Sequence, residues 1–448
     1  MIQRIKQYIS TLLGKHQQEN HVSSFLVNAS IRLFILQCSS LALGFLLNFL
    51  LVKTVALKEY GTYVYLFNLL NLLVSFCLFG VDTLLVKMTA VYTTLGKLQN
   101  IKGILLFSAL TVLLGSFLTA FISTAVLPFF RRTDVPVHTG WFVLVFASLL
   151  MLSVTTASQS ILQGLNKVIR SQIAEKIAKP LLMIIVFAIL YYRGKTASFN
   201  ELIWINLSAT AIVMVFTFIF LRNILNAPYK KVTFAFETRS WLTSVTGFFA
   251  MNILYALNSR VNIFLLGIIK GDEAVGVFNV VARLGELMGF ILSIINFVVA
   301  PLTARLYKQG DIKSLQQVVT LSARVVFFAS LPLVVLLVLF RKQVLLLFGV
   351  SFLTGQSTLV ILCLGQLLNI LLGSVGTLLI MSGNQRFSIL SLGISLIVNI
   401  ALTFLFTPRY GIAGTALATS ISLGIWNVLM YFFVRKKLHI RTTALGVI

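Results

Sequence analysis

Long apolar segments alternate with short polar ones along almost the whole chain. A helix needs about 20 residues to cross roughly 30 Å of hydrocarbon, and each segment comes close to that length or exceeds it. Within lipid, a single segment satisfies its own backbone polar groups only as a helix. The pattern therefore predicts an all-α, polytopic membrane protein with twelve transmembrane helices, at residues 30–52, 62–86, 103–127, 140–163, 176–192, 201–221, 243–269, 275–303, 322–340, 356–381, 387–407 and 412–434.

Composition excludes a soluble protein, because 58% of the residues are hydrophobic and only 10% are charged. Soluble domains carry about 25% charged residues. The formal net charge is +25, from 36 basic and 11 acidic residues. Two explanations for this excess remain open: basic loops that fix the orientation of the helices, and an electropositive cavity that attracts an anionic cargo.

The basic residues are unequally divided between the two sides of the membrane. If the N-terminus is cytoplasmic, 24 Lys and Arg residues fall on the inner side and 10 on the outer side. Short cytoplasmic loops are enriched in Lys and Arg. The distribution predicts that both termini are cytoplasmic, with an N-terminal segment at 1–29 and a basic tail at 435–448.

The two halves of the chain resemble each other. A shift of 215 residues places Gly61 on Gly276 and Leu69 on Leu284. Six helices per half bring the second half into the membrane from the same side as the first, so a pseudo-twofold axis along the membrane normal should relate two six-helix lobes. We expect lobes at 30–222 and 241–434, joined by a cytoplasmic linker at 223–240.

Arg260 is the most informative charged residue within a predicted span. It lies ten residues before Lys270, and a helix rises 1.5 Å per residue, so it should lie ~15 Å from the outer end. A charge at that depth costs roughly 2.5–3.5 kcal/mol on insertion scales. It either contacts an anionic cargo through the guanidinium fork or forms a structural ion pair with Glu286. Asn258, on the same span, either contacts the cargo or bonds to a neighbouring helix.

Three further charged residues within predicted spans are candidates for function. Arg283 and Glu286 are three residues apart, on one helix face. They either neutralise each other, or Arg283 is a second contact for an anionic cargo and Glu286 couples transport to a proton or sodium ion. Asp82 either couples transport to an ion in the same way or caps its helix against Lys87.

The sequence shows no catalytic signature. It contains no carboxylate dyad, Walker loop or nucleophile elbow, and its four histidines and three cysteines have no metal-ligand spacing. We therefore expect a protein that is not an enzyme and that needs no cofactor and no metal.

Three segments carry a resemblance to a known family: ILQGLNKVIRSQIAEKIAKPLL at 161–182, NSRVNIFLLGIIKGDEAVGVFNVVARLGEL at 258–287 and RYGIAGTALATSIS at 409–422. The chain resembles the polysaccharide and oligosaccharide flippases, including Wzx-type O-antigen flippases, of the multidrug/oligosaccharidyl-lipid/polysaccharide exporter superfamily. The resemblance implies a V-shaped, two-lobed bundle in the bacterial inner membrane.

The resemblance also implies a cargo and partners. The cargo would be an undecaprenyl-pyrophosphate-linked oligosaccharide, moved by alternating access for the synthesis of a surface polysaccharide such as lipopolysaccharide O-antigen. With such a cargo, Arg260 and Arg283 would be the ligands of the diphosphate and Asn258 would bind sugar hydroxyls. Besides the bilayer, the candidate partners are a polysaccharide polymerase and a chain-length regulator, with no nucleic acid. A multidrug exporter of the same superfamily, coupled to H+ or Na+, is the alternative. A membrane-embedded glycosyltransferase or polymerase is a third, disfavoured by the short outer loops.

Overall fold

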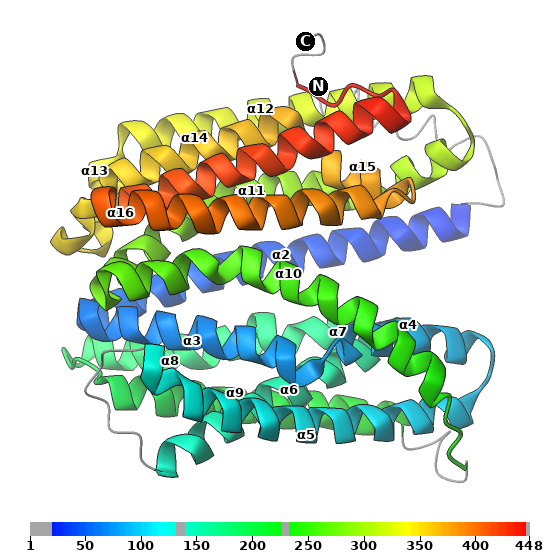
Figure 1. The fold of residues 1–448 in the computed structure, drawn as a ribbon, viewed down its shortest axis with the longest axis horizontal. Helices are drawn as coiled ribbons and strands as arrows, with labels where there is room; N and C mark the ends of the chain where they lie inside the picture. The colour runs from blue at the N-terminus through cyan, green and yellow to red at the C-terminus, as the bar shows by residue number, and fades with distance from the viewer. Residues whose placement is uncertain (1–19, 131–138, 226–232, 445–448) are drawn as a thin grey trace.

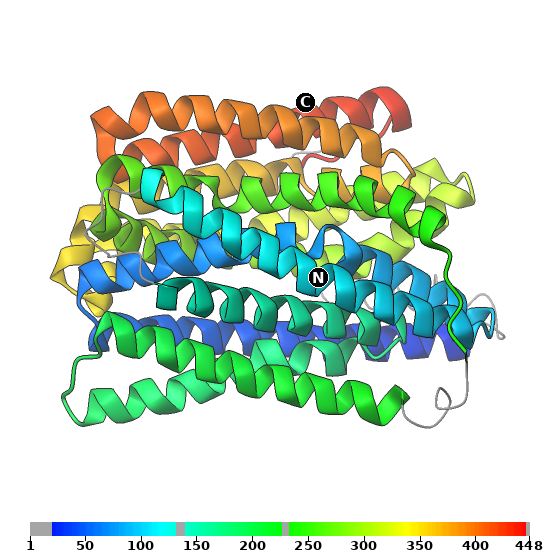
Figure 2. The same ribbon diagram turned by 60° about the horizontal axis from the view of Figure 1, so that its bottom comes forward.

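The fold is described from a computed structural model that covers the backbone at residues 20–130, 139–225 and 233–444. Within these ranges the chain is almost entirely helical and contains no strand. The long helices run roughly parallel to one another and form one elongated bundle (Figures 1 and 2). Most of the predicted N-terminal segment at 1–29 lies outside the described residues, and its last ten residues belong to the first described helix.

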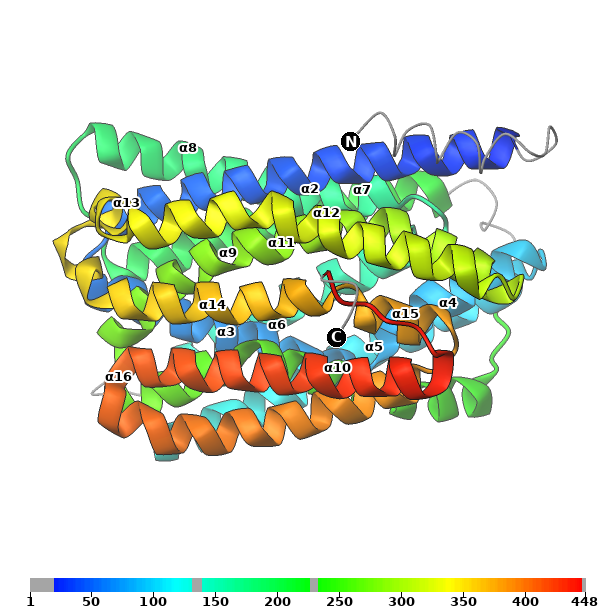
Figure 3. The same ribbon diagram turned by 90° about the horizontal axis from the view of Figure 1, so that it is seen from above.

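Ten of the described helices are long and apolar enough to cross a membrane. One of them contains two passes, because its Gly411 is non-helical (φ 59°, ψ −137°) and reverses the chain (Figure 3). A further pass consists of three short consecutive helical segments at 168–192. The described residues thus form the twelve predicted passes: α2 (Asn20–Thr54), α3 (Leu57–Leu78) with α4 (Val81–Thr94), α5 (Leu98–Phe130), α6 (Thr139–Gly164), α7 (Val168–Ile173) with α8 (Lys179–Tyr192), α9 (Phe199–Leu225), α10 (Thr238–Lys270), α11 (Asp272–Lys308), α12 (Ile312–Leu339), α14 (Gln356–Leu372) with α15 (Val375–Met381), and the two halves of α16 (Gln385–Leu438).

Several passes are interrupted where the apolar pattern is continuous. The second pass breaks at Phe79 and Gly80, both with positive φ, between α3 and α4. The tenth breaks at Gly373, between α14 and α15. The fifth begins eight residues before the predicted 176, and a π-helical segment, Ala174–Ala178, joins α7 to α8. The link between the ninth and tenth passes also contains a short helix, α13 (Arg341–Phe348), and a 3-10 turn.

The two ends of the bundle differ in how the lobes pack. We call the end with the turns at 55–56, 271 and 411 the joined end, and the end with the turns at 95–97, 309–311 and 382–384 the split end. At the joined end, one apolar cluster contains buried residues of both predicted lobes, including Leu50, Tyr60, Val64, Leu266, Val277 and Leu359. Toward the split end, the described residues of each lobe form a cluster of their own, one around Leu84 and Ile104 and the other around Leu315 and Leu379.

The joined end is closed by the two glycines that the internal repeat places in register. A methyl group on Gly61 of α3 would overlap the backbone carbonyl of Asp272 at the start of α11. A methyl group on Gly276 of α11 would lie 3.3 Å from the carbonyl oxygen of Leu57. Leu57 and Asp272 are themselves 215 residues apart, so each lobe supplies the same pair of positions to the crossing.

Side-chain hydrogen bonds reinforce this crossing. The buried Tyr60 hydroxyl donates to Asn48 Oδ1 over 3.0 Å and accepts from Asn279 Nδ2 over 2.8 Å. Thr62 Oγ1 donates to Asp272 Oδ2 over 2.5 Å. The bonds between α3 and α11 tie the two lobes together at the joined end.

Helix α10 belongs to both lobes. Its Trp241 is fully buried in the split-end cluster of the first lobe, together with Val245, and Figure 1 shows α10 crossing obliquely between the two groups of helices. Farther along, its Leu266 lies in the cluster shared by both lobes. The lobe boundary predicted at residue 241 remains a prediction, but the core of the first lobe includes the beginning of α10.

The segment after α16 folds back onto the second lobe. Ala444 N donates to the carbonyl of Leu371, and Arg324 Nε donates to the carbonyl of Ala444 over 3.1 Å. Figure 3 shows this segment beside α15. The described part of the predicted tail at 435–448 therefore packs against helices, while 445–448 lie outside the described residues.

Candidate functional site

Arg260 lies in the second half of α10 and faces the other lobe. Its side chain is half-buried, and Nη1 donates to Asn68 Oδ1 of α3 over 3.1 Å. Its Nε and the Nδ2 atom of Asn258 are buried with no hydrogen-bond partner among the described residues. Within the described chain no ion pair joins Arg260 to Glu286, so the structure does not contain that neutral pair. The guanidinium keeps its charge and part of its donor capacity.

A second cation, Lys179, reaches the same part of α3. The apolar pattern places Lys179 near a cytoplasmic helix end, but it lies in the middle of the continuous pass at 168–192. Its Nζ is 5.2 Å from the ring centroid of Phe67, the neighbour of Asn68. Arg260 and Lys179, from different lobes, therefore contact consecutive residues of one helix. The nearest sequence signal is Pro180, which allows the local change of helix type that precedes it.

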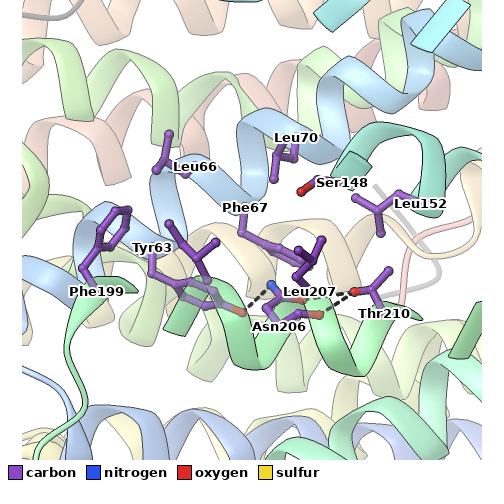
Figure 4. Close-up of a pocket in the computed structure, with 11 residues that line it drawn as sticks. Tyr63, Leu66, Phe67, Leu70, Ser148, Leu152, Phe199, Asn206, Leu207 and Thr210 are labelled. Atoms are coloured by element: carbon purple, nitrogen blue, oxygen red, sulfur yellow. Dashed lines mark hydrogen bonds between the residues drawn. The ribbon is translucent and has the colours of Figure 1, made fainter. Parts of the chain in front are cut away.

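Phe67 is held in place from its other side. Figure 4 shows a small cavity between α3, α6 and α9, lined by Phe67, Tyr63 and Asn206 among others. The Tyr63 and Phe67 rings stack with centroids 5.9 Å apart, and Asn206 Nδ2 donates to the Tyr63 hydroxyl over 3.0 Å. The cavity measures about 50 Å³, which suffices for one or two water molecules but not for a sugar. Stacking against Tyr63 orients the Phe67 ring that Lys179 Nζ lies over.

Arg283 and Glu286 are both exposed on α11. A methyl group on Gly44 of α2 would lie 4.0 Å from Arg283 Nη1, so the guanidinium approaches the backbone of the first helix. Arg260 lies 11 residues before the turn at Gly271 and Arg283 lies 12 residues after it, so the two arginines have similar depths on neighbouring helices. Arg260 contacts α3, whereas Arg283 approaches α2.

Asp82 lies in the first turn of α4, directly after the break at Phe79 and Gly80. Asn252 Nδ2 of α10 donates to both carboxylate oxygens, at 3.0 and 3.1 Å. A cap against Lys87 is not formed among the described residues; Lys87 Nζ lies over the Phe248 ring instead, 5.7 Å from its centroid. Asp82 therefore links the first lobe to α10.

Among the described residues, no group of three or more His, Cys, Asp or Glu side chains could hold a metal ion. The candidate site is instead a set of cations between two helical lobes: Lys179 and Arg283 lie within electrostatic reach of Glu175 and Glu286, whereas Arg260 is bonded to a neutral amide. Such a set can bind an anion.

Comparison with known proteins decides the family. The sequence model of the polysaccharide biosynthesis protein family matches residues 26–307, more than half of the chain. The chain belongs to this family. A second model, MatE, matches residues 248–405 of this family member.

The family member also resembles individual proteins. The capsular polysaccharide biosynthesis protein CapF of Staphylococcus aureus is 26% identical over 185 residues, which are 41% of this chain and 46% of CapF. The matched region thus spans under half of that relative. An inward-facing multidrug resistance MATE family transporter of the MOP superfamily superimposes with a TM-score of 0.72 at 15% identity, covering 91% of this chain and 98% of the transporter. The lipid II flippase MurJ in an inward closed conformation gives 0.70 at 16% identity, covering 90% and 87%. These likenesses establish a multi-pass membrane transporter fold.

Proposed function

We propose that this protein is a flippase that moves an undecaprenyl-pyrophosphate-linked oligosaccharide across the bacterial inner membrane for surface polysaccharide synthesis. One observation carries the proposal: Arg260 is held between the lobes by a neutral amide rather than by a carboxylate. A guanidinium in this setting remains available to a diphosphate, which it can bind through two parallel N–H···O bonds.

The neighbouring groups favour the same cargo. Lys179 adds a second cation on the same stretch of α3, and the unpaired Nδ2 of Asn258 offers a donor to a phosphate or sugar oxygen. Arg283, at a similar depth on α11, provides a further contact for the diphosphate as it moves between the lobes. Multiple cations lower the energy of an anionic headgroup in a site where the dielectric constant is low.

The two ends of the bundle supply a route for alternating access. The lobes share one core at the joined end and have separate cores at the split end. The turns at the split end, and the residues beside them, carry Lys97, Lys167 and Lys313, as expected of cytoplasmic loops. The described conformation would then admit cargo from the cytoplasm, with both termini on that side, and rocking of the lobes would release it outside.

Two acidic residues are the candidates for coupling transport to an energy source. Glu286 is exposed on α11, three residues from Arg283. It is our candidate for coupling to a proton or sodium ion. Asp82 is the second candidate, because its bonds to Asn252 connect α4 to α10 and would respond to a change in charge. A polysaccharide polymerase and a chain-length regulator remain the proposed partners, and lipopolysaccharide O-antigen is the proposed class of product.

Substitution of Arg260 tests the proposal. We expect Arg260→Ala to reduce surface polysaccharide at least tenfold in a flippase-null strain, because a hydrogen bond to a charged group contributes about 1.5–3 kcal/mol. Arg260→Lys should retain intermediate activity, since it keeps the charge but loses the fork. Arg193→Ala, at an exposed turn, is the matched control and should be neutral.

Membrane protein levels are measured in parallel. If Arg260→Ala complements as well as the wild type at equal expression, Arg260 does not bind the cargo. A multidrug exporter is the competing function, and it predicts instead that Arg260→Ala increases efflux of cationic dyes by removing a repulsive charge. The cations at Arg260 and Lys179 disfavour that alternative.

A further inference from the structure

A second, larger cavity lies between α4, α6 and the first half of α10. Its volume is about 440 Å³, within the range of about 300–1,000 Å³ that is typical of small-molecule sites. Most of its lining residues are polar, in contrast to the apolar cavity of Figure 4. The side chains that matter for its chemistry are Asp82, Lys87, Gln159, Ser160, Gln163 and Phe248.

The composition of this lining excludes several ligand classes. Asp82 and Lys87 have opposite charges, so the lining offers neither a phosphate nor a metal cation a field of one sign. An apolar drug would leave the amides and charged groups without partners. A ligand with many neutral hydroxyl groups matches the lining, because each hydroxyl both donates and accepts and therefore suits amides, a carboxylate and an ammonium together. Phe248 adds an apolar surface for the C–H face of a sugar ring.

Gln159 shows that the cavity has an unmet hydrogen-bonding demand. Its side chain is 7% exposed, and its Nε2 has no partner among the described residues. A buried amide donor without an acceptor costs about 1–3 kcal/mol. Nε2 itself is buried, so rotation of the side chain would turn the amide toward the cavity, where a ligand oxygen would provide the missing acceptor.

The cavity lies along the same helix as Arg260, and this position relates the cavity to the proposed cargo. Asn252, which holds the carboxylate of Asp82, and Phe248 lie 8 and 12 residues before Arg260 on the same helix. At 1.5 Å per residue the cavity is therefore ~12–18 Å nearer the split end than the guanidinium. A glycan attached to a diphosphate at Arg260 would extend toward it.

We infer that this cavity binds a sugar of the cargo's glycan, with Gln159 and Gln163 as the residues that select among glycans. The inference rests on the proposed function, because it takes the diphosphate at Arg260 as the point from which the glycan extends. Arg260 recognises the diphosphate, which all such lipids share, whereas the cavity recognises the glycan, which differs between them.

Native mass spectrometry of the purified full-length protein separates the two contacts. The probe is a lipid extract from membranes of the source cells, supplemented with undecaprenyl pyrophosphate. Each bound species is identified by its mass, and the ratio of the glycan-bearing adduct to the undecaprenyl pyrophosphate adduct reports on recognition of the sugar. We expect Gln159→Leu to lower this ratio about three- to tenfold, as the loss of one or two neutral hydrogen bonds predicts.

Two controls make the result interpretable. Gln159→Leu removes an unpaired buried amide and should not impair folding. Gln172→Leu changes the same residue type at a site where a glutamine also has an unpaired buried atom but does not line the cavity; its ratio should equal that of the wild type. Arg260→Ala should lower both adducts together.

The outcomes distinguish the inference from the proposed function. An unchanged ratio in both Gln159→Leu and Gln163→Leu overturns the sugar site, while a loss of both adducts in Arg260→Ala still supports the flippase. If the wild type binds neither lipid, the proposed function and the sugar site both fail. An equal decrease in Gln159→Leu and Gln172→Leu would mean that the effect is structural, and would also overturn the inference.

Discussion

At the joined end a single apolar core passes through both lobes, whereas at the split end each lobe packs around a core of its own. The same repeated helices run through both ends of the bundle. The difference between the ends therefore arises from the residues at the contact surfaces between the lobes. At the joined end, two glycines let backbones approach, as small residues do in membrane helix pairs. At the split end, polar side chains and the beginning of α10 lie where the other lobe would have to pack. Tight apolar contact defines one end of this bundle, whereas at the other end the cores stay separate, and under the proposed function that end admits the cargo.

Of the substitutions considered, Gly61→Ala should most reduce the difference in packing between the two ends. The added methyl group meets backbone atoms of α11, which cannot rotate away as a side chain can. We expect the free energy of unfolding to fall by about 1–3 kcal/mol, as for other overpacked sites, and the joined end to open. Melting temperature in one detergent measures the first effect. Labelling of Val277→Cys, buried in the shared core, measures the second.

Gly393→Ala is the matched control, because a methyl group there would have no neighbour within 4 Å. It should leave stability unchanged or raise it, since alanine favours helix more than glycine does. Equal melting temperatures for Gly61→Ala and the wild type, with Val277→Cys still unreactive, would show that the crossing does not hold the joined end closed.

Tyr92→Phe should have an intermediate effect, at the split end. The Tyr92 hydroxyl donates to Glu237 and accepts from the buried Trp241 indole, each over 2.8 Å. A phenol with its ordinary pKa of about 10 is protonated at neutral pH, so the hydroxyl can donate to Glu237. Its loss leaves the indole N–H unpaired and should lower stability by about 1–3 kcal/mol.

Proteolysis near the start of α10 provides a second measurement, because the bond network holds that start against the first lobe. Tyr255→Phe is the control, since Tyr255 is on the same helix and is 38% exposed. A Tyr92→Phe protein that matches this control in both stability and cleavage would show that the network does not anchor α10.

Thr62→Val should have the smallest effect. It removes one bond between the lobes, to Asp272, at a position that is only partly buried. We expect a loss of about 0.5–1.5 kcal/mol and no opening of the joined end, because the glycine crossing remains. A loss as large as that of Gly61→Ala would mean that side-chain bonds, rather than close backbone approach, hold this end together.

The sequence predicted the number of passes and the repeat because both depend on patterns that are local in the chain. It also placed Gly61 and Gly276 in register, which the structure brings to one crossing. It did not predict the break at Phe79, since a non-glycine residue with positive φ leaves no trace in an apolar pattern. Gly80, the next residue, lies where the backbone of α10 approaches closely. The two are far apart in the sequence, so a local pattern does not reveal the contact.

The candidate site was only partly predictable for a similar reason. Depth within a span identified Arg260, but its partner, Asn68, is 192 residues away and lies on the other half of the chain. The apolar run puts Lys179 near a helix end because that run begins there, whereas the helix itself begins eight residues earlier, at Val168. An apolar run shows where the sequence becomes compatible with lipid. A transmembrane helix that lines a polar space begins before that point.

The glycine crossing has a consequence for how such a chain can arise. Position 61 meets position 272, and position 276 meets position 57, so each half offers the other the same two positions. This is the rule of an isologous interface, in which one surface is complementary to itself. A six-pass ancestor carrying a single copy of that surface would form the joined end as a symmetric homodimer. Fusion of two copies then frees each half to diverge, so that an arginine can remain in one half without a counterpart in the other.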